Sequence, residues 1–383
     1  MLKKLEIKNY KSILNETIEL GKINFFIGEN GCGKTNILEA LAMMSASKSL
    51  ELHAEGLFNR GIRVSRPNLT FSSFANLMQK EKIYINLEFQ NDKEIFNLQS
   101  SIYCEDINDI YSEWKDDSPT YLIDKDKHHL HKSIHNISNE KKEDKTIKER
   151  WIVNDVNQLT KYLIFCLNTK ALRGISSESK RMPLGINGES LDILLSQFTN
   201  DEWEILQKYR YLVSWLEEII VDEKDSLKYK GHKMGKSTSI LYFKDRFMQK
   251  KDMNNIFSAE NANDGVLHVL FYLALFISSK TPSFFAIDNI ENSLNPKICR
   301  ELVKELIQLA KINCKQALIT THNPAVLDGI NLNDEEQRLF VVSRNDSGKT
   351  KVKQIKLKPR TDERLKLSEM WMRGILGGLP KNF

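Results

Sequence analysis

The feature that most constrains this chain is a glycine-rich stretch, GENGCGKT at residues 28–35, which matches the pattern GxxxxGKT. It follows an apolar segment at 22–27 (KINFFI) and precedes a helical pattern from Asn36 to about Ser47. In this setting the loop can curl so that successive N–H groups point at phosphate oxygens, and the helix adds its positive N-terminal end. The sequence therefore predicts a nucleotide-binding loop between a strand and a helix.

The same stretch carries side chains that suit a nucleoside triphosphate and its metal ion. Lys34 is expected to reach the β- and γ-phosphates, and the Thr35 hydroxyl to bind Mg²⁺. A neighbouring strand should end in a carboxylate for that ion, and the apolar segment at 283–287 is followed by Asp288. We therefore expect a nucleoside triphosphate and Mg²⁺ as cofactors. The residues of the loop expected to contact the nucleotide are Asn30, Gly31, Cys32, Gly33, Lys34, Thr35 and Asn36.

Composition places the chain among globular proteins with a sizeable core. Hydrophobic residues make up 41% of 383 residues, and a net charge of +5 is too small to indicate a polyanionic partner by itself. The longest apolar run, 266–278, is shorter than the ~20 residues that cross a bilayer. The N-terminus lacks the pattern of a signal peptide, and five cysteines without CxxC spacing argue against a disulfide framework or structural zinc. We expect a cytoplasmic protein without a membrane partner.

Further motifs extend the prediction beyond the loop. Residues 288–296 (DNIENSLNP) resemble the D-E-P-E-x-x-L-H-P stretch of ABC-type AAA ATPases, a group that includes RecF, SMC proteins and the overcoming-lysogenization-defect family. Residues 8–12 (KNYKS) look like that group's first strand. Asn263-Asp264-Gly265 takes the place of its S-D-G signature at the start of a helix, and 321–324 (THNP) is similar to its switch-histidine loop. Two further similar segments are MPLGINGESLDILL at 182–195 and MWMRGILGGLP at 370–380.

The resemblance implies an α/β fold: a P-loop NTPase of the ABC-ATPase type, with a mixed sheet, a β-rich N-terminal lobe and a largely helical insertion. Alternating residues at 2–8 and 83–89 agree with strands in that lobe. Helix-period segments at 191–198 and 203–220 agree with a helical insertion. The expected parts are 1–99 as the N-terminal part of the head, 100–237 as the insertion and 238–383 as the C-terminal part.

The resemblance also implies a head that dimerises around ATP, so a homodimer or a higher even oligomer is expected. One subunit would supply Lys34, Thr35, Asp288 and His322, and the facing subunit would supply Asn263, Asp264 and Gly265 across the γ-phosphate. Two alternatives stay open: Asn-Asp-Gly is also an ordinary turn, and a histidine can cap the end of a strand.

Two residues depart from the family pattern. Asn289 stands where the family has the glutamate that polarises the attacking water, and an amide can orient water but cannot accept a proton at neutral pH. We therefore expect slow hydrolysis, with Glu291 and His322 as the candidates to compensate, although neither occupies the family's position. Asn263 replaces the usual serine and still offers a hydrogen-bond donor.

Two clusters and one arginine lie outside these motifs. Tyr229 and His232 interleave with lysines, a pattern that suits phosphate contact and base stacking, although a solvated hairpin is the alternative. The lysines are Lys224, Lys228, Lys230, Lys233 and Lys236.

Four histidines without a carboxylate at helical spacing favour an exposed loop over a metal site. They are His128, His129, His131 and His135. Arg173 matches an arginine near the family's insertion and receives no role.

The resulting hypothesis is an ATP-gated regulatory subunit for a separate effector, a nuclease or toxin, in bacterial anti-phage defence. The chain continues only a few residues past GGLP at 377–380, whereas the TOPRIM nuclease domain of overcoming-lysogenization-defect proteins would need on the order of 100 residues. The alternative is a RecF-like DNA-binding ATPase in DNA repair or recombination. Two other functions, a transporter subunit and a small-molecule kinase, explain fewer of these motifs.

Overall fold

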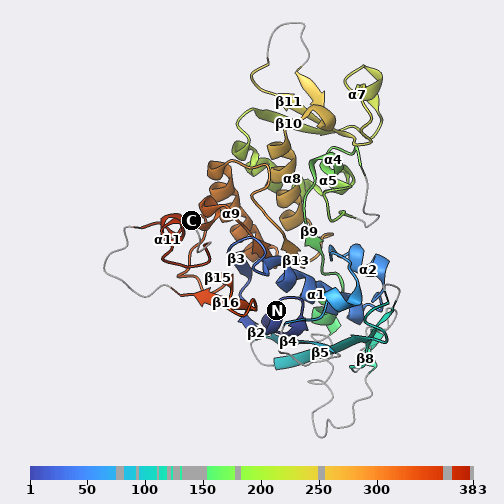
Figure 1. Ribbon diagram of the computed structural model, residues 1–383. Coiled ribbons are helices and arrows are strands. Elements are labelled where there is room, and N and C mark those ends of the chain that lie inside the picture. The colour runs from blue at the N-terminus through green and yellow to red at the C-terminus, as the bar shows by residue number, and fades with distance from the viewer. Residues whose placement is uncertain are drawn as a thin grey trace, which may run out of the picture.

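The computed structural model (Figure 1) describes residues 1–74, 82–91, 95–109, 112–118, 122–123, 130–131, 153–176, 183–248, 255–356 and 365–379. Their centre is a six-stranded sheet in the order β16-β15-β3-β14-β13-β9, in which every adjacent pair is parallel except β15 and β16. Its strands are β3 (Ile23–Ile27), β9 (Ile164–Phe165), β13 (Phe284–Ile287), β14 (Gln316–Thr320), β15 (Gln337–Arg344) and β16 (Thr350–Ile355).

The central sheet is covered on both faces, which explains why its inner strands are continuously apolar. Phe26 of β3 points to the face covered by α1 (Lys34–Lys48) and stacks on Phe340 of β15 at a ring separation of 5.0 Å. Its neighbours Phe25 and Ile27 join the opposite core, together with α8 (Asp264–Ile277) and α9 (Pro296–Ile312). The expected buried strand before the loop and the buried helix at 266–278 are both confirmed.

The N-terminal lobe is a five-stranded antiparallel sheet in the order β2-β1-β4-β5-β6, packed over the other side of α1. Leu5 and Ile7 of β1 face the core opposite Leu87 and Ile85 of β4, so the expected alternation and the β-rich lobe are confirmed. The strands are β1 (Leu2–Tyr10), β2 (Ile13–Glu19), β4 (Ile83–Gln90), β5 (Ile95–Cys104) and β6 (Trp114–Asp116).

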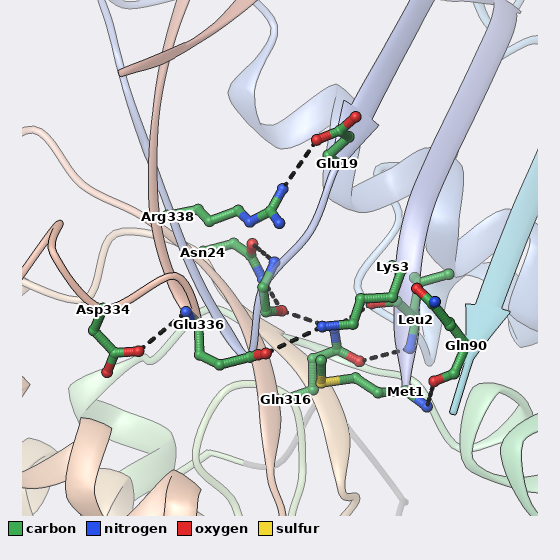
Figure 2. Close-up of polar contacts among 11 residues, drawn as sticks. Met1, Leu2, Lys3, Glu19, Asn24, Gln90, Gln316, Asp334, Glu336 and Arg338 are labelled. Carbon is green, nitrogen blue, oxygen red and sulfur yellow. Dashed lines mark hydrogen bonds and ion pairs between the residues drawn. The ribbon is translucent and has the colours of Figure 1, made fainter. Parts of the chain in front are cut away.

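A buried polar network joins this lobe to the central sheet (Figure 2). The Gln316 side chain accepts the Leu2 N–H at 3.1 Å and donates to the carbonyls of Leu2 and Gly21 at 2.7 and 2.8 Å. Nearby, the Lys3 ammonium lies 3.1 Å from the Glu336 carboxylate. These contacts hold the first strand against the strands beside the glycine-rich loop.

The remaining described elements include the three-stranded antiparallel sheet β10-β11-β12, drawn at the top of Figure 1, and residues 153–160, which are helical. The other strands are β7 (Leu122–Ile123), β8 (Leu130–His131), β10 (Leu216–Val221), β11 (Leu241–Asp245) and β12 (Ile256–Ser258). The other α-helices are α2 (Ala54–Phe58), α4 (Thr169–Leu172), α5 (Leu191–Ser196), α6 (Asn200–Lys208), α7 (Ser226–Tyr229), α10 (Pro324–Leu327) and α11 (Leu367–Met372). Three 3-10 helices are η1 (Pro67–Leu69), η2 (Arg210–Leu212) and η3 (Ala259–Asn261). No helix in these ranges is both long and apolar enough to cross a membrane.

Strands run through the region expected to be a helical insertion. β5 crosses the expected boundary at 99/100, β9 joins the central sheet, and β10 pairs with β11 on the far side of 237/238. The helix expected over 203–220 is wrong after Lys208, where α6 ends. From Leu216 the β-branched residues Ile219, Ile220 and Val221 pair with β11, because such side chains suit a pleated surface better than a helix.

A buried lysine ties the end of α8 to the start of β13. The Lys315 ammonium donates to the carbonyls of Ser278, Thr281 and Pro282 at 2.8 to 3.2 Å and lies 2.9 Å from the Thr281 hydroxyl. Burial lowers the pKa of Lys315 to about 8. Because α8 begins at Asn263-Asp264-Gly265 and β13 ends at Asp288, this contact fixes the spacing of two predicted site segments.

Candidate functional site

The glycine-rich loop connects β3 to α1 and is shaped by the β15–β16 hairpin. Gly28 and Gly33 have φ values of 150° and 112°. A Cβ on Gly28 would lie 2.1 Å from the Val342 carbonyl oxygen, and one on Gly33 would lie 2.3 Å from the Thr350 Oγ1 atom. A side chain at either position would clash with the β15–β16 hairpin. Glycine therefore allows the loop to pass close to the hairpin with the tight curvature that a phosphate-binding turn requires.

Lys34 starts α1 and is almost fully buried. Its ammonium donates to the carbonyl oxygens of Gly28 and Glu29, both at 2.9 Å. Burial lowers the pKa of Lys34, and the nearby Cys32 thiol, Asp288 and Glu291 partly oppose this effect. Because a phosphate is a stronger acceptor than a carbonyl, the ammonium is placed to exchange these contacts for a nucleotide.

Asp288 lies at the carboxyl end of β13 and binds two hydroxyl groups. Thr35 Oγ1 donates to its carboxylate at 3.1 and 3.3 Å, and Thr320 Oγ1 donates at 2.5 Å. The same Thr320 oxygen accepts the Asn289 N–H at 2.9 Å. A hydroxyl beside a carboxylate is the all-oxygen donor set that Mg²⁺ prefers. Thr35 and Asp288 would therefore hold the ion, as the sequence predicts, and Thr320 orients Asp288.

His322 and Glu291 lie beside this pair. The backbone N–H of His322 donates to Glu291 Oε1 at 2.8 Å, whereas Glu291 Oε2 is buried and has no hydrogen-bond partner among the described residues. Partial burial and the Lys34 ammonium lower the pKa of His322, and Glu291 and Asp288 partly oppose this. The imidazole is therefore neutral near pH 7 and retains one N–H for a phosphate oxygen.

The signature residues, Asn263-Asp264-Gly265, lie at the N-terminus of α8 and not in the glycine-rich loop. Asn263 caps α8 through its Oδ1 atom, which accepts the Val266 N–H at 3.0 Å, so the expectation that these residues open a helix is confirmed. Asp264 pairs with Arg173 at 2.7 Å, and Arg173 also donates to the Ala262 carbonyl. The signature borders a cavity of about 1060 Å³ that is not lined by residues of the glycine-rich loop.

Sequence reasoning missed three contacts near the predicted site residues. They are the Thr320 hydroxyl on Asp288, the Arg173 pair with the signature, and a charge cluster around Glu39. Glu39 is fully buried in α1 and pairs with Lys11 at 2.5 Å and Arg63 at 2.8 Å, and the mostly exposed Arg63 side chain also reaches Asn36. The one available signal was an acidic residue within the apolar segment ILEALAMM at 37–44.

The lysine arm, defined as residues 224–236, projects beside β10 and contains α7. Tyr229 and Met234 are 83% and 95% exposed. Lys233 is half-buried and donates to the Ser239 carbonyl, whereas the other four lysines of the set are exposed. The histidines at 128, 129 and 135 lie outside the described residues, and only the backbone of His131 is described, in β8. Within the described ranges, no group of three or more His, Cys, Asp or Glu residues is arranged to hold a metal ion.

These features define the fold of the chain: an α/β P-loop fold that is similar to the heads of SMC proteins. The head of an SMC protein solved with the C-winged helix domain of ScpA matches with a TM-score of 0.57 and 16% identity, over 93% of this chain and 98% of that one. The SMC head domain from Thermotoga maritima matches with a TM-score of 0.51 and 14% identity, over 93% and 99%. Identities this low establish the fold alone.

The chain belongs to the family described as "AAA domain, putative AbiEii toxin, Type IV TA system", whose model matches residues 23–328. Curated relatives include the DNA replication and repair proteins RecF of Parabacteroides distasonis, 52% identical over 50 residues, and Bacteroides fragilis, 32% identical over 99 residues. These matches cover 13% and 24% of this chain and 14% and 25% of those relatives. The chain thus spans a quarter or less of either relative's length.

The role of Thr320 is tested with Thr320→Val, which keeps the shape of the side chain but removes its hydroxyl. A charge-assisted hydrogen bond is worth ~1.5–3 kcal/mol, so we expect the affinity for ATP with Mg²⁺ to fall about tenfold or more. Calorimetric titration with and without Mg²⁺ should show the loss only with the ion. Thr320→Ser is the matched control and should retain wild-type affinity; equal losses in both variants would contradict this role.

Proposed function

We propose that the protein binds ATP and Mg²⁺ between two copies of the chain. The separation of the two phosphate-binding segments carries this proposal: the signature at the start of α8 borders a cavity that none of the glycine-rich loop residues line. Each site would be completed by the facing subunit. The expected contacts are Lys34, Thr35, Asp288 and His322 from one copy, and Asn263, Asp264 and Gly265 from the other.

Each group has a defined task in such a site. The Lys34 ammonium and the loop N–H groups neutralise the β- and γ-phosphates, and Thr35 with Asp288 holds Mg²⁺. The Asn263–Gly265 segment brings the unpaired N–H groups of the α8 N-terminus toward the γ-phosphate of the facing subunit. Arg173 fixes Asp264, so the acidic side chain is held by a cation beside the incoming phosphate.

Hydrolysis is proposed to be slow. Asn289 occupies the position of the family's glutamate in a left-handed conformation with φ of 57°, and its backbone N–H is held by Thr320. An amide at this position orients water without taking its proton, and the loss of a general base typically lowers a rate by ~10² to 10⁴ fold. ATP would therefore stay bound long enough to act as a signal.

The shared site is tested by mixing two inactive variants. Lys34→Ala removes the phosphate contact of the loop, and Gly265→Asp places a negative charge where the facing γ-phosphate is expected. Each alone should lack ATP turnover, because two copies of the same variant form no intact site. The mixture should recover up to about half of wild-type turnover, since a mixed pair has one intact site of two. A mixture as inactive as the separate variants would contradict the proposal.

We further propose that the ATP-bound dimer acts in the cytoplasm as the sensor or regulatory subunit for a separate effector, a nuclease or toxin, in bacterial anti-phage defence. Two comparisons support a protein partner. The family description names a toxin of a toxin–antitoxin system, and the SMC head of one solved structure is bound to a domain of ScpA. Affinity purification of the chain with the product of its adjacent gene tests this proposal. We expect retention that requires ATP and is lost in Lys34→Ala; assembly with copies of itself alone would contradict it.

A RecF-like DNA-binding ATPase in repair or recombination is the second candidate, favoured by the relatives named RecF and by the lysine arm. Four exposed lysines and the exposed Tyr229 ring offer phosphate contacts and a stacking surface on one arm. In this candidate, DNA bound by the arm would stimulate ATP turnover.

The arm is tested by replacing its five lysines with serine. Each lost phosphate contact should reduce the slope of log affinity against log salt by about 0.7 for single-stranded DNA and 0.9 for duplex. The measurement is fluorescence anisotropy of labelled oligonucleotides across a salt series. A control variant with Lys304→Ser and Lys311→Ser, on the exposed side of α9, should keep the wild-type slope. An unchanged slope in the arm variant would exclude this site.

A further inference from the structure

We propose that Glu291 accepts the proton of the water that attacks the γ-phosphate, in place of the missing glutamate at position 289. This inference rests on the proposed ATP site and assigns the chemistry within it. Glu291 lies three residues beyond Asp288, in the turn that connects β13 to α9. It therefore brings a second carboxylate to the edge of the sheet that carries the metal-binding residues.

The backbone of this turn fixes where the carboxylate lies. The Ile290 side chain is buried, and its N–H donates to the Thr320 carbonyl at 3.2 Å. The Glu291 carbonyl accepts the Leu294 N–H at 3.0 Å. Glu291 Oε1 accepts the backbone N–H of His322 at 2.8 Å, which anchors one end of the side chain to the loop after β14. A carboxylate held at one oxygen and at the backbone on both sides is preorganised.

The second oxygen is free for chemistry. Glu291 Oε2 is buried and has no hydrogen-bond partner among the described residues. A buried carboxylate oxygen without a donor is costly to leave unsatisfied, so the site favours a water molecule there. Asn289 cannot accept a proton near neutral pH, and the imidazole N–H of His322 is committed to the γ-phosphate in the proposed site.

The charges around Glu291 are those of the nucleotide site. Its carboxylate opposes the lowering of the Lys34 and His322 pKa values, so it lies in the field of both phosphate-contacting residues, as does Asp288. On the opposite side, burial raises the pKa values of Tyr272 and Cys299, so both are uncharged. Of these groups, Lys34 is the cation, and the two on the buried side add no charge.

The proposed step balances as a hydrolysis. The water oxygen forms a bond to the γ-phosphorus, the bond from that phosphorus to the β–γ bridging oxygen breaks, and its electron pair leaves with ADP. The water proton moves to Glu291 Oε2, directly or through one further water, and then passes to the phosphate product. No oxidant, reductant or additional co-reactant is needed.

The test compares Glu291→Gln with the wild-type chain. Gln keeps an oxygen that can accept the backbone N–H of His322, so structure and ATP binding should be retained. Its amide cannot take a proton from water. We expect the ATP dissociation constant and the melting temperature to stay near wild-type values, while turnover falls about 100-fold or more. Glu204→Gln, an exposed acid on α6, is the matched control and should leave turnover unchanged.

A rescue experiment separates proton transfer from a structural role. Adding Asn289→Glu to the Glu291→Gln chain restores a carboxylate at the family's position, and turnover should recover at least tenfold.

Turnover of Glu291→Gln within threefold of wild type would overturn the proposal, as would a failed rescue or a wild-type dimer that binds ATP without hydrolysing it. A wild-type chain that binds no ATP would instead overturn the proposed function on which this inference rests.

Discussion

The carboxylate of Asp288 is the interaction on which the site depends. It follows β13 and binds two hydroxyl groups from other elements, Thr35 at the start of α1 and Thr320 at the end of β14. Residues 253 positions apart in the sequence therefore share one carboxylate. Because parallel strands end at the same edge of a sheet, the order β3-β14-β13 brings these groups together, and a buried core on each face holds that order.

The same architecture places the signature, Asn263-Asp264-Gly265, at the start of α8 and not beside Asp288 in the sequence. α8 covers one face of the sheet and presents Asn263 to Gly265 at its N-terminus, and Lys315 fixes the other end of this helix beside the start of β13. In the proposed site both segments contact phosphate, one through a lysine and a glycine-rich turn and the other through a capped helix end with an arginine-paired aspartate. If two chains enclose ATP, both segments contact the same ligand. In that arrangement Asn289 and Glu291 would determine how fast the ATP is hydrolysed.

The sequence predicts those parts of the molecule that depend on neighbouring residues. The loop at 28–35, the strand before Asp288 and the capped start of α8 each carry a local signal, and the structure has them as expected. The contacts of Thr320, Arg173 and Arg63 depend on pairing between distant segments, which one sequence does not reveal. β9 has only two residues, too few to show a period, and β10 follows a helix whose apolar spacing continues into it. The roles of the signature and of His322 remain predictions for the same reason: they need a second chain or a nucleotide.

The mass of the protein in solution tests the central claim most directly. Light scattering should give the 44.4 kDa monomer without nucleotide and twice that mass, or a higher even multiple, with ATP and Mg²⁺. Lys34→Ala should stay monomeric under both conditions, because it lacks the contact that retains the triphosphate. A wild-type chain that binds ATP at full occupancy and still scatters as a monomer would contradict the account.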